Sequence, residues 1–165
     1  MSDFLVGLGV DHHVLREERL NNHGFPLTLG GYVIPDQSVS LDSNCDGDVL
    51  IHALCNALST ALGDGSLAPT TDALCGSGIK YSRDFLAPFL KKIRDQGYSI
   101  NNISASIEAQ KPHLEEHRSA ITASLSEALS LDLSRIGISF TTGEGLTACG
   151  RGKGIYAQVI CSLTR

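Results

Sequence analysis

Two different periodicities in the apolar residues limit the fold of this chain more than any other feature. From Asp48 to Leu62, apolar residues recur at three- and four-residue spacing, which predicts an amphipathic helix that ends at Gly63. Over residues 102–109, apolar residues instead alternate with Asn, Ser and Glu, which predicts a half-buried strand. A chain with both patterns belongs to the mixed α and β classes.

The other elements are predicted from similar local signals. Gly30 and Gly31 separate two short apolar runs, and such a pair suits the positive φ angles of a tight hairpin turn. Ser82 is expected to cap a helix that continues to Gln96. Further strands are predicted over residues 4–10, 136–140 and 155–163, a further helix after Pro112 as far as 129, and loops over 15–25, 64–81 and 143–154.

This order of elements predicts a single domain, residues 1–165, of the α/β (α+β) type. We expect a two-layer sandwich in which helices cover one face of a mixed sheet, in a ferredoxin-like arrangement. A length of 165 residues suits one domain better than two.

The net charge limits the partners that we expect, and the cysteines indicate the cellular compartment. A formal charge of −5 argues against a nucleic-acid partner or a polybasic membrane surface, and no apolar run approaches the ~18 residues that span a bilayer. A signal peptide is not expected, because no basic segment precedes an apolar stretch at the amino end. The five cysteines are odd in number and include no CxxC pair, so we expect a cytoplasmic protein with Cys55 and Cys161 as small core residues.

Asp11 and His13, which follow the first predicted strand, are candidate metal ligands. Side chains alternate along a strand, so these two share a face and His12 lies on the other. His52 from the first long helix completes a set of the kind that zinc uses, and Asp48, one turn earlier, is expected to accept the ring N–H of His52. The alternative is that both histidines are merely hydrogen-bonded, one at a strand end and one in a polar pocket.

Residues 141–154 form a glycine-rich segment that carries hydroxyl groups. Hydroxyls and exposed N–H groups suit phosphate oxygens, Arg151 adds a fork of donors, and Glu144 can hold a hard divalent cation. A hairpin loop whose glycines only permit tight turns explains the pattern equally well. The pair Asp46 and Asp48 likewise suits a helix N-terminus on electrostatic grounds alone.

Eight short motifs in a fixed order nevertheless match one family over nearly the full chain. They are Asp11-x-His13, Leu29-Gly30-Gly31-x-x-Ile34-Pro35, Asp46-Gly47-Asp48-Val49-x-x-His52-Ala53-Leu54, Ala61-Leu62-Gly63-Asp64, Ser82-Arg83, Ala109-Gln110-x-Pro112, Thr141-Thr142-x-Glu144 and Gly150-Arg151-Gly152-x-Gly154-Ile155. With them the chain resembles the 2-C-methyl-D-erythritol 2,4-cyclodiphosphate synthase family.

The resemblance implies a reaction, two metals and an assembly. The reaction converts 4-diphosphocytidyl-2-C-methyl-D-erythritol 2-phosphate to the 2,4-cyclodiphosphate and CMP, in the non-mevalonate route to isoprenoids. The implied assembly is a homotrimer with active sites between subunits, in which one subunit supplies a zinc ion and the next supplies the cytidine pocket. Glu144 and the substrate diphosphate are implied to hold a second divalent ion, Mg²⁺ or Mn²⁺.

The resemblance also implies the site residues. Asp64 is implied to contact the ribose, and the loop from Ala109 to His117 to enclose the cytosine. The implied metal ligands are Asp11, His13, His52 and Glu144, and the implied catalytic residues are Thr142 and Asn44. The implied substrate-binding residues are Asp11, His13, Asn44, Cys45, Asp64, Gly65, Ser66, Asp72, Ala109, Pro112, His113, Thr141, Thr142, Glu144 and Arg151.

The chain departs from the family's pattern at several substrate contacts. Asn44-Cys45 stands where the family usually has His-Ser, and an amide donates a hydrogen bond but carries no positive charge. His113 replaces a usual lysine, and Ala148 a usual phenylalanine. These changes leave open a non-catalytic or altered-specificity trimer that binds nucleotide or prenyl phosphates. A zinc hydrolase of another family is a third interpretation, although the chain lacks a HExxH glutamate.

Overall fold

A computed structural model describes residues 3–35 and 37–165, and within them one mixed sheet forms the centre of the protein. The sheet has the strand order β4-β1-β7-β5-β6. The strands are β1 (Phe4–Arg16), β4 (Ser40–Leu41), β5 (Ser99–Glu108), β6 (Ile136–Thr141) and β7 (Gly154–Thr164). Neighbours pair antiparallel except β5 and β6, which are parallel and are joined by the crossover helix α4 (Arg118–Leu129).

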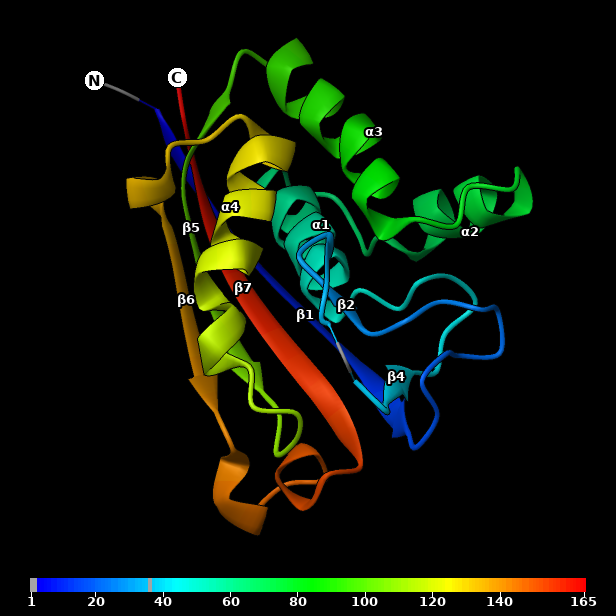
Figure 1. Ribbon diagram of the computed structural model, residues 1–165. Coiled ribbons are helices and arrows are strands. Elements are labelled where there is room, and N and C mark those ends of the chain that lie inside the picture. Colours follow the sequence, from blue (N-terminus) through cyan, green and yellow to red (C-terminus); the bar gives the residue numbers. More distant parts are fainter. Residues whose placement is uncertain (1–2, 36) are drawn as a thin grey trace.

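The helices lie on one face of this sheet, which confirms the two-layer expectation (Figure 1). Helix α1 (Val49–Ala61) crosses β1 and β7, α4 packs on β6, and α3 (Ser82–Asp95) packs on α1. The ferredoxin-like expectation is wrong in its connections. The long elements run strand, helices, strand, helix, strand, strand, whereas a ferredoxin-like fold runs strand, helix, strand, strand, helix, strand.

The predicted hairpin and first long helix are confirmed, and one aspartate joins them. Strands β2 (Thr28–Leu29) and β3 (Tyr32–Val33) flank Gly30 and Gly31, whose φ angles of 62° and 77° are available to glycine without strain. Asp48 caps α1 by accepting the Ile51 N–H at 3.0 Å, and its two carboxylate oxygens also accept the N–H groups of Gly30 and Gly31. The hairpin is therefore held against the start of α1.

Glycines on β1 allow α1 to lie very close to the sheet. A Cβ atom on Gly7 would overlap the carbonyl oxygen of Ala57, and a Cβ atom on Gly9 would overlap that of Ala53. Small residues on both elements thus bring the start of α1 next to the middle of β1. This close approach brings the His52 side chain of α1 within reach of Asp11 and His13 on β1.

Three local predictions need correction. Strand β1 extends beyond residue 10 to Arg16, because β7 and β4 both pair with its second half. Residues 64–81 are not all loop, since α2 (Ala68–Gly76) forms there; α2 is mostly exposed, so it has no apolar stripe to detect. Ser82 is not the N-cap of α3: Tyr81 takes that position, and the buried Ser82 is the first helical residue.

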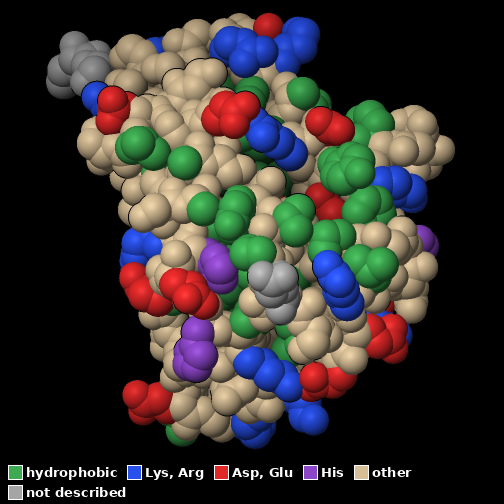
Figure 2. All heavy atoms as spheres, viewed as in Figure 1, with side chains coloured by type: hydrophobic (Ala, Val, Ile, Leu, Met, Phe, Trp, Pro, Cys, Tyr) green, Lys and Arg blue, Asp and Glu red, His purple; other side chains and the backbone are tan. Residues whose placement is uncertain are grey.

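The loop predicted over 143–154 contains two short 3-10 turns, η3 (Gly143–Gly145) and η4 (Cys149–Arg151). Cys55 and Cys161 are fully buried, as predicted, and all five cysteines are free thiols. None of the described helices is long and apolar enough to cross a membrane. On the face shown in Figure 2, acidic and basic side chains are interspersed.

The sheet face opposite the helices carries an apolar stripe. The odd-numbered residues of β1 face α1, and the large even-numbered ones face away. Five of these outward residues and one from β7 are 44% to 62% exposed: Phe4, Val6, Leu8, Val10, Val14 and Ile160. We call this set the apolar stripe; an exposed apolar patch of this kind is typical of a protein interface.

Candidate active site

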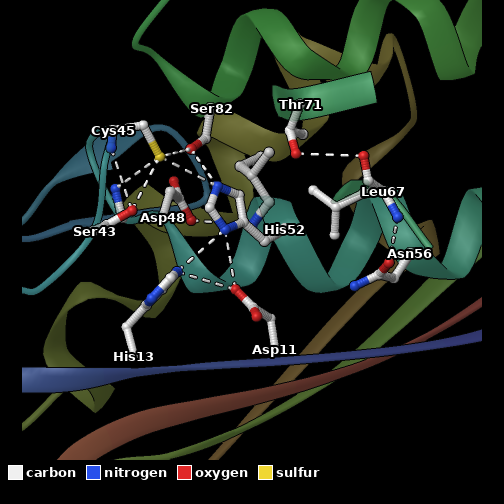
Figure 3. A network of polar contacts seen from close by, with 12 residues as sticks. Asp11, His13, Ser43, Cys45, Asp48, His52, Asn56, Leu67, Thr71 and Ser82 are labelled. Atoms are coloured by element: carbon white, nitrogen blue, oxygen red, sulfur yellow. Dashed lines mark hydrogen bonds and ion pairs between the residues drawn. The ribbon is translucent and has the colours of Figure 1, made fainter. Parts of the chain in front are cut away.

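Three of the predicted metal ligands converge where β1 meets the first turn of α1 (Figure 3). Asp11 and His13 point from the covered face of β1, and His52 points toward them from α1. The Asp11 Oδ2 atom lies 3.0 Å from His52 Nδ1 and 3.2 Å from His13 Nε2. His13 Nε2 and His52 Nδ1 are 3.2 Å apart, so three donor atoms face one point.

The protonation of this group reflects its close contacts. Burial raises the pKa of Asp11, but hydrogen bonds with His13 and His52 outweigh it and hold that pKa well below its usual range. Burial lowers the pKa of His52, but hydrogen bonds to Asp11 and Cys45 raise it to about 10. The pair is thus a carboxylate and an imidazolium at neutral pH, and a divalent cation that binds here displaces the His52 proton.

The donor set fits zinc. One carboxylate oxygen and two imidazole nitrogens, all within 4.8 Å of one another, are a usual protein contribution to a zinc site that keeps a position open for substrate. His12 is exposed on the other face of β1, as expected, and takes no part in this group.

The expected partner of the His52 ring is wrong. Both carboxylate oxygens of Asp48 are engaged by backbone N–H groups of the hairpin and of α1. His52 Nε2 instead lies 2.9 Å from the hydroxyl of Ser82 and 3.6 Å from the thiol of Cys45. An aspartate before a helix can cap it or reach one turn along it, and here the cap prevails.

A cavity of about 340 Å³ opens beside the metal group. Its lining includes His13 and His52 together with Asn44, Cys45 and Asp72, all of which were predicted site residues. Asn44 is exposed, whereas Cys45 is 3% exposed, so at the departure from the family's His-Ser pair only the first residue meets solvent freely. Helix α2, which sequence patterns missed, supplies Asp72.

A second cavity, of about 140 Å³, lies at the carboxyl ends of β5 and β6. Four of the predicted substrate-binding residues are in its lining: Ala109, His113, Thr141 and Thr142. Pro112 lies within the same loop, after a cis peptide bond. This cavity and the one beside the metal group have no lining residue in common among those described.

The remaining predicted residues lie elsewhere in the chain. Asp64, Gly65 and Ser66 are exposed beyond the end of α1, and Asp64 pairs with Lys92. Glu144 is exposed in η3 with a φ of 46°, an unusual value for a residue other than glycine. Arg151 donates from Nη1 to the carbonyl oxygens of Gly145 and Leu146, both at 3.1 Å, and so braces this loop.

Comparison of the chain with known protein families identifies the family to which it belongs. A sequence model of the YgbB family matches residues 4–164. The chain belongs to the YgbB family. This match covers both cavities and every predicted site residue, so an unrelated zinc hydrolase is excluded.

Relatives in the YgbB family share one name. The 2-C-methyl-D-erythritol 2,4-cyclodiphosphate synthase of Thiobacillus denitrificans is 36% identical over 168 residues, covering 100% of this chain and 99% of the relative. The protein of that name from Lachnospira eligens is 40% identical over 161 residues, covering 96% of this chain and 83% of the relative.

Solved structures agree with this YgbB assignment. IspF of Plasmodium falciparum in a CDP complex has a TM-score of 0.82 at 28% identity, covering 97% of this chain and 95% of that chain. A structure of 2-C-methyl-D-erythritol 2,4-cyclodiphosphate synthase in a CDP-bound form has a TM-score of 0.81 at 31% identity, covering 96% and 99%.

Proposed function

We propose that this protein converts 4-diphosphocytidyl-2-C-methyl-D-erythritol 2-phosphate to 2-C-methyl-D-erythritol 2,4-cyclodiphosphate and CMP. The observation that carries the proposal is the convergence of Asp11, His13 and His52 beside a cavity, in a chain whose full-length relatives bear the name of this synthase. The non-catalytic alternative has less support, because a protein that only binds a nucleotide has less need of a metal-binding group beside its cavity.

The reaction sets a clear physical requirement. One phosphate must attack another, so the site must offset charge repulsion and hold the two groups in line. Zinc bound by Asp11, His13 and His52 would supply positive charge to a phosphate oxygen, and a second divalent ion at Glu144 would neutralise the diphosphate further. No group on the protein has to form a covalent bond to the substrate.

The protein's own donors then position the substrate. Asn44 borders the cavity beside the metal group, where its amide can donate to a phosphate oxygen. Thr142 borders the other cavity, and its hydroxyl can donate to the diphosphate beside the cytidine. Ala109, Pro112 and His113 would enclose the cytosine base. Asp64, with Gly65 and Ser66, would contact the ribose, and Arg151 would keep the loop around Glu144 in shape.

We also propose that the active site is completed between subunits of a homotrimer. Two observations support this. The metal group and the cavity at the carboxyl ends of β5 and β6 use different residues on different strands, and the apolar stripe lies open on the face that no described helix covers. Three stripes that meet around a threefold axis would bury one another. We place the reaction in the cytoplasm, as the free cysteines suggest.

Release of CMP from the cytidylyl substrate tests this function together with its metal requirement. We expect the chelator-treated protein to regain CMP release when zinc and magnesium are added, and His52→Ala to lose bound zinc and nearly all release while it remains folded. His12→Ala is the matched control, since this histidine lies on the same strand but faces away. Full zinc content in His52→Ala, measured by metal analysis, would refute the ligand assignment.

A further inference from the structure

The two ring nitrogens of His52 face different surroundings. Nδ1 faces Asp11 and His13, whereas Nε2 faces the hydroxyl of Ser82 at 2.9 Å (Figure 3). Ser82 is 0% exposed, and the same hydroxyl contacts Oδ1 of the buried Asp46. A chain of three side chains thus runs from Asp46 through Ser82 to the ring of His52.

Asp46 sets the direction of these hydrogen bonds. An ionised carboxylate has no proton to give, so the Ser82 O–H donates to Asp46, and the Ser82 oxygen remains to accept from His52 Nε2–H. Asp46 is itself held in place, because its Oδ2 accepts the Ser82 backbone N–H at 2.9 Å and its Oδ1 accepts the Asp48 backbone N–H at 3.3 Å.

We infer that Ser82, oriented by Asp46, is a positioning residue that keeps the proton of His52 on Nε2 and so leaves Nδ1 as the metal-binding nitrogen. The opposite neutral tautomer would put two buried acceptors, Nε2 and the Ser82 oxygen, face to face without a proton, and would forfeit a buried hydrogen bond. Ser82 and Asp46 thus hold the His52 ring through Nε2 and leave the Nδ1 lone pair directed toward Asp11 and His13.

The geometry also explains a second cluster of possible ligands. Cys45, Asp46 and His52 bring their side-chain donor atoms within 4.8 Å of one another. The Ser82 hydroxyl lies among them, 3.7 Å from Cys45 Sγ and 2.9 Å from His52 Nε2 and in contact with Asp46. A hydroxyl therefore fills the place that an ion would need, and the cluster supports the ring of His52 instead.

This inference rests on the proposed zinc site, and two variants test it. Ser82→Ala removes the nearer acceptor for Nε2–H and leaves only the Cys45 thiol at 3.6 Å. Asp46→Asn keeps the side-chain volume but removes the charge that directs Ser82. Ser40→Ala is the control, because Ser40 is equally buried and its hydroxyl has no partner among the described residues. Zinc affinity is measured by competition with a chromophoric chelator. In zinc-loaded protein labelled with ¹⁵N-histidine, NMR follows exchange of the His52 Nε2 proton with water.

We expect both variants to bind zinc roughly 10–100-fold more weakly, with a faster-exchanging Nε2 proton, and the control to match the wild type. Wild-type affinity and a protected Nε2 proton in the two variants would overturn the inference alone, whereas a wild-type protein that binds no zinc would overturn the proposed site as well. If Ser82→Ala does not fold, Asp46→Asn decides. If neither folds, the two residues are structural and the inference is wrong.

Discussion

Gly9 on β1 lies directly against the carbonyl oxygen of Ala53 on α1, with no room for even one methyl group between them. Ala53 follows His52 in the chain, so the spacing that Gly9 permits also sets how close the His52 ring comes to Asp11 on the same strand. The 3.0 Å contact between His52 Nδ1 and Asp11 Oδ2 depends on it. The close packing of α1 on β1 therefore also determines the geometry of the metal group.

Replacing Gly9 by alanine should therefore damage stability and the metal site together. The new methyl group meets backbone rather than a flexible side chain, so α1 must move, and we expect a loss of about 3 kcal/mol or more in the free energy of unfolding. Zinc content should fall as well. Denaturant unfolding and metal analysis measure the two effects. In the control Gly137→Ala the added Cβ would have no neighbour closer than the Ile103 carbonyl oxygen at 4.0 Å, so it should change neither.

A charge in the apolar stripe should break the proposed trimer. Leu8 is 50% exposed on the open sheet face, and Leu8→Asp would bring three carboxylates together around the threefold axis. We expect a monomer in sedimentation experiments, with zinc still bound and CMP release lost. Leu133→Asp, which alters a residue 55% exposed in the turn η2 (Leu133–Arg135), serves as the control. A Leu8→Asp protein that still sediments as a trimer would contradict the assignment of this face.

A site shared between subunits predicts complementation. Asp11→Asn should disable the metal side and Glu144→Gln the opposite side, so each variant alone should be nearly inactive. When subunits of the two are mixed and exchanged, some interfaces regain two intact sides, and CMP release should recover in part. Continued inactivity after exchange has been verified by mass spectrometry would mean that each site belongs to one subunit.

The pair Asn44-Cys45 should lower the catalytic rate without weakening metal binding. Asn44 borders the cavity as a neutral donor, and a hydrogen bond from a charged donor is about twice as strong. The double change Asn44→His with Cys45→Ser should then raise kcat by about tenfold, equivalent to about 1–2 kcal/mol, with zinc content unchanged. Steady-state kinetics decide it. An equal or lower kcat would assign that stabilisation to another group, such as Thr142.

The sequence was most informative where the site residues lie within a strand or helix that has a clear periodic pattern. Alternation along β1 placed Asp11 and His13 on one face, and the helical repeat led to His52. The prediction that Ser82 caps a helix was wrong, because a serine ahead of a helix resembles a cap and its buried role depends on Asp46, 36 residues earlier. No sequence pattern indicated the roles of Gly7 and Gly9, which depend on how closely α1 lies over them. Helix α2 was missed because it is mostly exposed and has no helical repeat of apolar residues.

The most direct test of the proposed function is the identity of the product. Wild-type protein with zinc and magnesium is incubated with 4-diphosphocytidyl-2-C-methyl-D-erythritol 2-phosphate, and ³¹P NMR follows the phosphorus resonances. We predict equal amounts of CMP and the 2,4-cyclodiphosphate, whose two coupled phosphorus atoms lie in one ring. CMP accompanied by an open-chain phosphate, or an unchanged substrate, would contradict the proposal that this chain is a cyclodiphosphate synthase.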